Sequence, residues 1–290
     1  MAELATRKKK TRADHAVTAY EAEADRPPGE RWVTMSHALT RAGQGLSLAE
    51  KRLVMACVSK LDSRKAISSE GRAYVRLHAK EYADAFGLDS STAYVALRES
   101  TEHLFERRIT FFAPVKRRQG KGLEETIVKM RWIDYCQYAK SEGWVMLRFV
   151  PELLPAITGL KQYFTTYQLQ QASALRSVYS WRLLELLMQY KKTGWAEFDV
   201  ADFAASMDAP AAQRRNFAFI RRRIIEPAVK ELKAKDGWDI EWKAVNAGRR
   251  VRAVRFSFSR NPQERLPLED VDMRADVARL EREQQKTVTE

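Results

Sequence analysis

The sequence predicts an α+β protein made of two tandem winged-helix domains, each a helix-turn-helix followed by a β-hairpin wing. Two observations support this fold class, the chain length and an order of elements that occurs twice, and positive charge concentrated in two segments indicates the kind of partner. The chain has 290 residues, of which 45% are hydrophobic. That length exceeds a typical domain of ~100–150 residues and supplies enough apolar side chains for two cores.

The first copy of the repeated pattern is expected to occupy residues 32–158. Its opening helix carries Leu53, Val54 and Cys57 among the apolar residues that share one helical face. After the next, smaller helix, Gly87 is expected to end that helix and a serine to cap the start of the long one. In chain order the expected elements are a helix (49–61), a strand (74–77), a small helix (82–86), a turn (87–91), a long helix (92–107), a hairpin (109–133) and a closing strand (144–150).

The second copy is expected to occupy residues 159–260 and repeats this order up to its hairpin. Inward and outward positions alternate cleanly over its last strand. Pro227 removes one hydrogen bond from the long helix, so a kink or a restart is expected there. The expected elements are a helix (177–190), a strand (196–200), a small helix (203–207), a turn (207–210), a long helix (216–235) and a hairpin (238–258).

Positive charge is unevenly distributed along the chain. The sequence holds 51 Lys or Arg and 38 Asp or Glu, for a net charge of +13. Residues 214–255 contain thirteen basic against five acidic residues, and residues 104–131 contain eight against three. The ends, 1–31 and 261–290, are expected to be tails, the second of them acidic. Nucleic acid is the polyanion that best matches such basic segments.

The long helix of the second copy is predicted to enter the major groove of double-stranded DNA, which admits one helix. An apolar stripe of Phe217, Ile220, Ile224 and Ala228 is expected to pack inward. A solvated Arg-rich helix is the alternative, which the charge excess, the helix order and the hairpin with its basic tip oppose. The predicted DNA contacts are Arg215, Asn216, Arg222, Arg223 and Lys230 to bases, Arg214 and Arg221 to phosphates, and Lys243, Arg249, Arg250 and Arg252 of the wing to the backbone or minor groove.

The long helix of the first copy leaves two interpretations open. It exposes hydroxyl and basic groups suited to DNA, but Glu99 and Glu102 would repel phosphates. One interpretation is base reading by Ser91, Thr92, Tyr94 and Arg98. The other is a structural helix, with phosphate contacts only from Arg107, Arg108, Lys116, Arg117 and Arg118.

Enzymatic chemistry is not expected, and neither is a cofactor or a metal. The four histidines are dispersed, and Gly120-Lys121 lacks the glycine and hydroxyl of a phosphate-binding loop. Tyr163, Tyr167 and Tyr179 could each be proposed as a DNA-cleaving nucleophile, but no histidine pair or acidic cluster accompanies them. Core packing is the favoured explanation for these tyrosines.

The sequence also predicts a cytoplasmic protein that neither spans a membrane nor is secreted. No segment approaches the ~18 apolar residues of a membrane span, and the basic N-terminus has no apolar run behind it. The two cysteines, Cys57 and Cys136, offer no disulfide framework.

Two motifs of the second copy resemble the Rep_3 family of plasmid replication initiators. The first is Arg176-Ser177-x-Tyr179-Ser180-x-Arg182-Leu183-x-Glu185-Leu186-Leu187, and the second is Phe219-x-Arg221-Arg222-x-Ile224-Ile225-x-Pro227-Ala228. The likeness covers about residues 32–259, and the first copy departs more from the family pattern.

The resemblance implies an initiator whose monomers bind direct repeats, called iterons, at a plasmid origin. It implies that dimers repress the gene through inverted copies of the repeat, with the first domain forming the dimer interface through its strands. Residues 214–223 would then be the main reading segment. Origin bending, opening of an A·T-rich segment, and recruitment of the host initiator and the replicative helicase are implied too. The competing interpretation is a winged-helix transcriptional repressor with no initiator role; an RNA-binding protein or a nuclease is more remote.

Overall fold

The computed structural model describes residues 26–67, 72–116, 123–140, 142–235 and 237–260. Most of the two predicted tails lies outside these ranges. Within the described part, a short 3-10 helix, η1 (Pro28–Glu30), precedes the first strand. The guanidinium of the buried Arg31 lies 2.8 Å from Glu81, and this ion pair attaches the segment before the first strand to the first unit.

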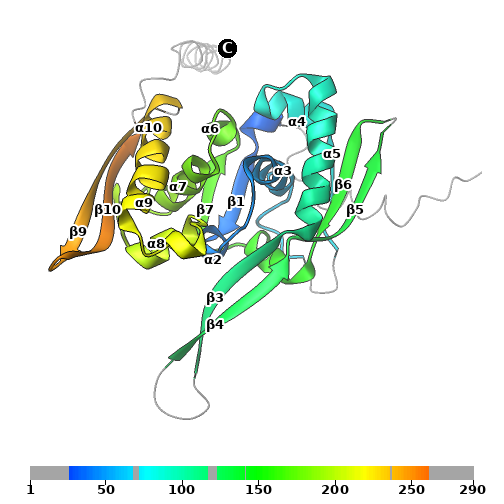
Figure 1. Ribbon diagram of the computed structural model, residues 1–290. Coiled ribbons are helices and arrows are strands. Elements are labelled where there is room, and N and C mark those ends of the chain that lie inside the picture. The colour runs from blue at the N-terminus through cyan, green and yellow to red at the C-terminus, as the bar shows by residue number, and fades with distance from the viewer. Residues whose placement is uncertain (1–25, 68–71, 117–122, 141, 236, 261–290) are drawn as a thin grey trace, which may run out of the picture.

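The first winged-helix unit combines three helices with a three-stranded antiparallel sheet (Figure 1). The strands are ordered β2-β6-β5, so the first strand pairs with the last. Its elements are α3 (Leu48–Val58), β2 (Tyr74–His78), α4 (Ala79–Phe86), α5 (Ser90–Glu106), β5 (Ile133–Ala139) and β6 (Trp144–Phe149).

The second unit repeats that order, with a sheet ordered β8-β10-β9. The 3-10 turn η3 (Ala211–Gln213) leads into the long helix. The unit's other elements are α7 (Val178–Met188), β8 (Trp195–Asp199), α8 (Val200–Ser206), α9 (Phe217–Ile220), η4 (Arg221–Ile225), α10 (Glu226–Lys235), β9 (Trp238–Ala247) and β10 (Arg250–Arg260). The predicted duplication of helix order and the predicted α+β class are therefore confirmed.

The predicted kink at Pro227 takes the form of a π-helical turn. Segment η4 continues α9 into α10, and the N–H of Glu226 donates to the carbonyl of Arg221, five residues earlier. A proline ring clashes with the carbonyl four residues before it in a regular α-helix. One wider turn relieves that clash without ending the helix.

The hairpin of the first copy was expected to be the wing, and this prediction is wrong. Strands β3 (Arg108–Lys116) and β4 (Leu123–Arg131) form a separate two-stranded sheet that projects from the body (Figure 1). The hairpin that pairs with β2, as β10 pairs with β8, is β5–β6. Hence β3–β4 is an additional hairpin inserted between the long helix and the wing.

A second two-stranded sheet lies between the units and was not predicted. Strand β1 (Trp32–Ser36) pairs antiparallel with β7 (Phe164–Gln168). The predicted boundary at residues 158/159 lies between these strands, so each side of it contributes one strand. Three short helical segments adjoin this part of the chain: α2 (His37–Arg41), η2 (Pro151–Ala156) and α6 (Gln170–Ser173).

Local capping explains where the helices of the first unit start and stop. Ser47 and Glu50 form a reciprocal capping box at the start of α3. Gly87 ends α4 with φ +62°, as predicted. The serine cap expected for α5 is wrong, because the carboxylate of Asp89 accepts the N–H of Thr92 at 3.1 Å. Aspartate serves this role as well as serine does.

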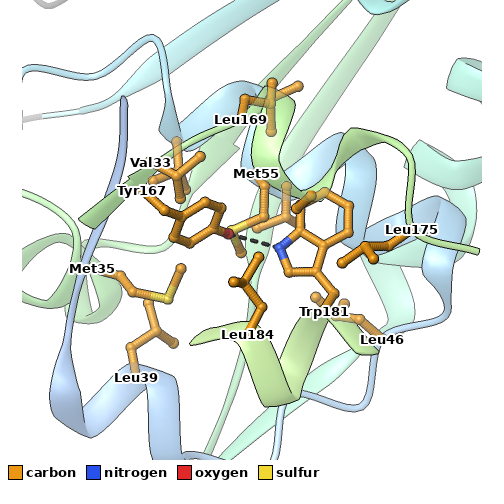
Figure 2. Close-up of a cluster of buried hydrophobic side chains, with 14 of the residues drawn as sticks. Val33, Met35, Leu39, Leu46, Met55, Tyr167, Leu169, Leu175, Trp181 and Leu184 are labelled. Atoms are coloured by element: carbon orange, nitrogen blue, oxygen red, sulfur yellow. Dashed lines mark hydrogen bonds between the residues drawn. The ribbon is translucent and has the colours of Figure 1, made fainter. Parts of the chain in front are cut away.

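Apolar side chains of both units meet around the β1–β7 sheet. Figure 2 shows Met35 of β1, Met55 of α3 and Leu184 of α7 in one cluster, and all three are fully buried. The indole N–H of Trp181 donates to the hydroxyl of Tyr167 at 2.8 Å within this cluster (Figure 2). The described part of the chain therefore has a continuous core across both units.

Beside this core lies a buried charged cluster that links α3 to α7. Nζ of Lys51 lies 2.7 Å from Oε1 of Glu185, and both side chains are 0% exposed. Lys51 also donates to Gln44 Oε1 at 2.6 Å, and Tyr167 donates to Glu185 at 2.8 Å. Removing one partner of such a pair leaves an uncompensated buried charge, which typically costs about 3–5 kcal/mol.

The stability of the folded chain is expected to depend on the protonation of Lys51. Burial lowers its pKa from 10.5 to about 8, although Glu185 opposes the shift. Between these two values the unfolded chain binds more protons than the folded chain, so rising pH favours the folded state. From pH ~8 to pH ~10, the free energy of unfolding should therefore rise by on the order of 2 kcal/mol relative to a Lys51→Met variant. Urea denaturation of the wild-type chain and of Lys51→Met at both pH values measures this difference. An equal change in the free energy of unfolding of both proteins contradicts the prediction.

Candidate nucleic-acid interface

The underside of the long helix in the second unit is apolar and buried, as predicted. Ile220, Ile224 and Ala228 are fully buried, and Phe217 is partly buried. The π-helical turn buries Ile225 as well. The helix is thus fixed to its unit along one side and leaves the opposite side to solvent.

The solvent side carries the predicted arginines. Arg215, Arg222, Arg223 and Lys230 are all exposed. None of these four forms an ion pair with the described part of the chain. Their charges remain available to an anionic partner.

Two arginines at the rim of this surface are held by the protein itself. Nε of Arg221 lies 2.7 Å from Glu226 Oε1, and its guanidinium lies 6.0 Å from the ring centroid of Trp242. Nε of Arg214 donates to the carbonyl of Ala209 at 3.0 Å. Both side chains are therefore oriented before any ligand binds, and both retain free N–H groups for phosphate.

Asn216 has a structural role in addition to its predicted contact with a base. Its side-chain oxygen accepts the N–H of Phe219 at 3.1 Å and so caps α9. Bidentate adenine recognition needs both the oxygen and the nitrogen of an asparagine amide. The structure therefore supports the capping role of Asn216, and its contact with a base stays a prediction.

The wing of the second unit presents a basic tip. Lys243, Arg249 and Arg250 are exposed, and Gly248 makes the turn with φ +62°. The pairing of β9 with β10 shifts register between Val251 and Ala253, so Arg252 is the extra residue of a β-bulge. Bulges redirect a side chain relative to the regular strand.

One acid of β8 binds two arginines of the wing. Oε1 of Glu197 lies 3.0 Å from Arg252, and Oε2 lies 2.6 Å from Arg255. Glu197 is not among the residues predicted from the sequence, because it precedes the basic segment 214–255. Alternation along β8 was the available signal, since it places Glu197 on the face opposite the buried Ala196 and Phe198.

In the first unit, the long helix offers fewer free groups. Arg98 is exposed, Tyr94 is partly buried, and Thr92 is exposed but its hydroxyl is hydrogen bonded to Asp89. The side chain of Ser91 lies outside the described part of the chain. Base reading by this helix therefore stays a prediction.

Of the two described basic side chains that directly follow that helix, one is paired with a buried acid and the other is exposed to solvent. Nε of Arg107 donates to both carboxylate oxygens of Glu50 at 2.9 and 3.0 Å, and Glu50 is 1% exposed. Arg107 thus compensates a buried charge, whereas Arg108 is exposed. The side chain of Lys116, together with Arg117 and Arg118, lies outside the described residues.

The tyrosines considered as nucleophiles have different environments. Tyr167 is fully buried, and burial beside Glu185 raises the pKa of its hydroxyl well above the usual value. Tyr179 is partly buried. Core packing is wrong for Tyr163, which is 73% exposed and has φ +54° in the turn before β7. In the ranges that the structure describes, no group of three or more His, Cys, Asp or Glu could hold a metal ion.

None of the described helices combines the length and apolar composition that a membrane crossing requires.

The two units, each with a helix-turn-helix and a hairpin wing, define a tandem winged-helix protein of mixed α+β class. The chain belongs to the Rep3 family of initiator replication proteins. The family model "Initiator Replication protein, WH1" matches residues 32–188, and "Initiator Rep protein, WH2" matches residues 199–258. The predicted family is therefore confirmed, and the family is one of initiators and not of enzymes.

Individual proteins are also similar to this chain. An uncharacterised 27.6 kDa protein of Escherichia coli is 25% identical over 210 residues, covering 70% of this chain and 85% of the relative. The PI protein of Escherichia coli is 23% identical over 253 residues, covering 77% of this chain and 80% of the relative. The crystal structure of the Pi initiator protein in complex with iteron DNA superposes with a TM-score of 0.63 at 20% identity, over 81% of this chain and 99% of that one. At this identity, the likeness to the solved structure shows the fold.

Glu197 is expected to limit the attraction of the wing to DNA. Glu197→Gln releases Arg252 and Arg255, so affinity for random-sequence duplex should rise several-fold and the salt dependence should steepen by up to about 1 in log–log slope. Fluorescence anisotropy at several salt concentrations measures both.

The matched control is Glu241→Gln, which removes the same charge from an exposed position on β9. Because Glu241 has no ion pair with the described residues, it releases no arginine. Equal effects of the two substitutions on affinity and on the salt slope would show that DNA binding responds to net charge and not to the release of these arginines.

Proposed function

We propose that this chain is a plasmid replication initiator that binds iteron DNA, with the long helix of the second unit in the major groove. The observation that carries the proposal is the two-sided character of this helix. Ile220, Ile224 and Ala228 fix one side to the fold, and Arg222 and Arg223 project from the other without carboxylate partners in the described structure. Family membership and the iteron-bound Pi initiator of similar fold support the same function.

The dimensions and chemistry of duplex DNA match the positions of the arginines on this helix and on the wing. The major groove is ~12 Å wide and admits one helix, and its edges distinguish all four base pairs. A guanidinium can donate two parallel hydrogen bonds to guanine, so Arg222 and Arg223 have the chemistry for base recognition. Arg249 and Arg250 at the wing tip are placed to neutralise phosphates of the adjacent backbone.

The proposal extends to two oligomeric states, monomers on direct repeats and dimers on inverted copies. Support for dimerisation comes from β4, which pairs only with β3 among the described residues and so leaves its other edge open. Ile127 and Val128 of β4 are 60% and 42% exposed. Apolar side chains along an open strand edge favour pairing with another chain. The first-unit strands thus serve as the proposed dimer interface.

Initiation in this proposal is a physical process and involves no catalysis. Several bound monomers bend the origin in the cytoplasm, favour opening of an adjacent A·T-rich segment, and recruit the host initiator and the replicative helicase. Bending a binding site by tens of degrees costs on the order of a few kcal/mol. Contacts from two units of each chain can offset this cost.

Footprinting of the intact protein on the DNA that flanks its gene tests the proposed function. Protection of several direct repeats beside an A·T-rich tract is the expected result. Protection of a single inverted repeat alone would instead favour a transcriptional repressor with no initiator role. Absence of any protected sequence would contradict both functions.

Substitutions at the helix and at the wing should have different effects. Arg222→Ala should weaken binding to the protected sequence by ~1–3 kcal/mol and relax the sequence preference, because a base contact is lost. Arg249→Ala should weaken binding to specific and random duplex equally and lower the salt slope by about 1, because a phosphate contact is lost. Titrations on both duplexes measure the difference. If Arg222→Ala weakens both complexes equally, its base-reading role is rejected.

A further inference from the structure

We propose that Asp208 is a positioning residue that fixes the helix-turn-helix of the second unit against the first unit. It thereby sets the spacing between the two parts of a DNA site that the units contact. The inference rests on the DNA binding proposed above and adds to it a specific determinant of site geometry. Asp208 lies in the turn after α8, on the side of the second unit that faces the loop between α2 and α3.

The carboxylate of Asp208 holds that loop directly. Its Oδ2 accepts the backbone N–H groups of Gln44 at 3.0 Å and of Gly45 at 3.3 Å. A Cβ at Gly43 would lie 3.3 Å from Oδ1 of the same carboxylate, so a glycine suits the close approach. Asp208 itself has φ +54°, a conformation that a non-glycine residue adopts at a cost. Its contacts with the loop compensate for this conformation.

The loop is in turn fastened to the first unit. The indole N–H of Trp132 donates to the carbonyl of Gln44 at 3.0 Å. Nζ of Lys51 on α3 donates to the side chain of Gln44 at 2.6 Å. A displacement of the Asp208 turn would therefore break hydrogen bonds to Gln44 or displace residues packed in the core of the first unit.

Further hydrogen bonds join the end of α8 to the end of α2. Nε of Arg182 donates to the carbonyl of Ser206 at 2.8 Å, and its Nη2 donates to the carbonyl of Ala42 at 2.7 Å. The hydroxyl of Ser206 donates to the carbonyl of Arg41 at 3.1 Å. Arg182 is 1% exposed, so these bonds are protected from water.

From Asp208 the chain reaches the reading helix through a short, internally bonded segment. Gln213 donates its N–H to Pro210 at 2.7 Å, Asn216 donates to Gln213 at 2.9 Å, and Arg214 donates to Ala209 at 3.0 Å. The start of α9 follows at Phe217. The position of this helix relative to the first unit therefore depends on the turn at Asp208.

Two binding units on one duplex act as a bivalent ligand. The second contact is intramolecular, and its strength depends on whether the linkage lets both units dock at once. Successive major grooves on one side of B-DNA recur every ~10.5 base pairs. A rigid junction accepts one spacing, whereas a loosened junction accepts several.

The test compares Asp208→Gly with Asp208→Asn in the intact chain. Glycine permits the positive φ and removes the acceptor, whereas asparagine also tolerates this conformation and keeps a side-chain oxygen for Gln44 and Gly45. The probes are the duplex protected in footprinting, and the same duplex with about one base pair inserted between the parts contacted by each unit. Ala201→Gly, at an exposed position of α8, is the control for destabilisation of the same helix.

Insertion should weaken wild-type binding at least ~10-fold, because one unit loses its groove. In Asp208→Gly this penalty should fall to less than ~3-fold, while Asp208→Asn and Ala201→Gly retain the wild-type penalty. An unchanged penalty in Asp208→Gly overturns the positioning role, and so does a reduced penalty in Ala201→Gly. If the wild-type chain binds no duplex, the proposed function fails and not only this inference.

Thermal melting establishes whether Asp208→Gly is folded. If it is not, Gly43→Val replaces it, since a Cβ at Gly43 would lie 3.3 Å from Oδ1 of Asp208 and a larger side chain separates the loop from this carboxylate. The same relaxation of the spacing penalty is expected for Gly43→Val. A wild-type penalty in that folded variant contradicts the proposal.

Discussion

The arrangement of the two winged-helix units depends on the buried ion pair between Lys51 and Glu185. These residues belong to α3 and α7, the first helices of the two units, and neither side chain contacts solvent. Separating the units would leave each charge buried without its partner or require water to enter the core. Hydrophobic burial around Tyr167 and Trp181 supplies attraction in this region, but it is not directional. The charges and hydrogen bonds define which orientation is stable.

The first of the two family motifs, residues 176–187, is explained by contacts within the fold. Arg182 and Glu185 are buried, where they bind backbone carbonyls and Lys51. Ser180 donates its hydroxyl to Glu231 of α10, which also accepts the N–H of Arg176 at 2.7 Å. These contacts hold α7 against the long helix. This first motif therefore marks residues that position the long helix, whereas the second motif contains Arg221 and Arg222 of the proposed interface.

Acidic residues divide the arginines of the proposed interface into two groups. Glu197 and Glu226 bind Arg252, Arg255 and Arg221 at the surface, whereas Arg222 and Arg223 have no such partner in the described structure. Paired arginines are oriented but partly neutralised, and unpaired arginines keep their full attraction for phosphates and base edges. Net charge alone would treat all of them as equivalent.

The sequence by itself determined the α+β class, the repeated order of elements, and which side of the long helix in the second unit is buried. These features follow from periodicity and capping, which involve residues a few positions apart. Tertiary structure decided that β5–β6 is the wing, that Arg107 compensates Glu50, and that Arg182 and Glu185 are buried. Each of these depends on strands or charges that lie far apart in the chain. Their pairing is set by the packed fold, so local spacing carries no signal for it.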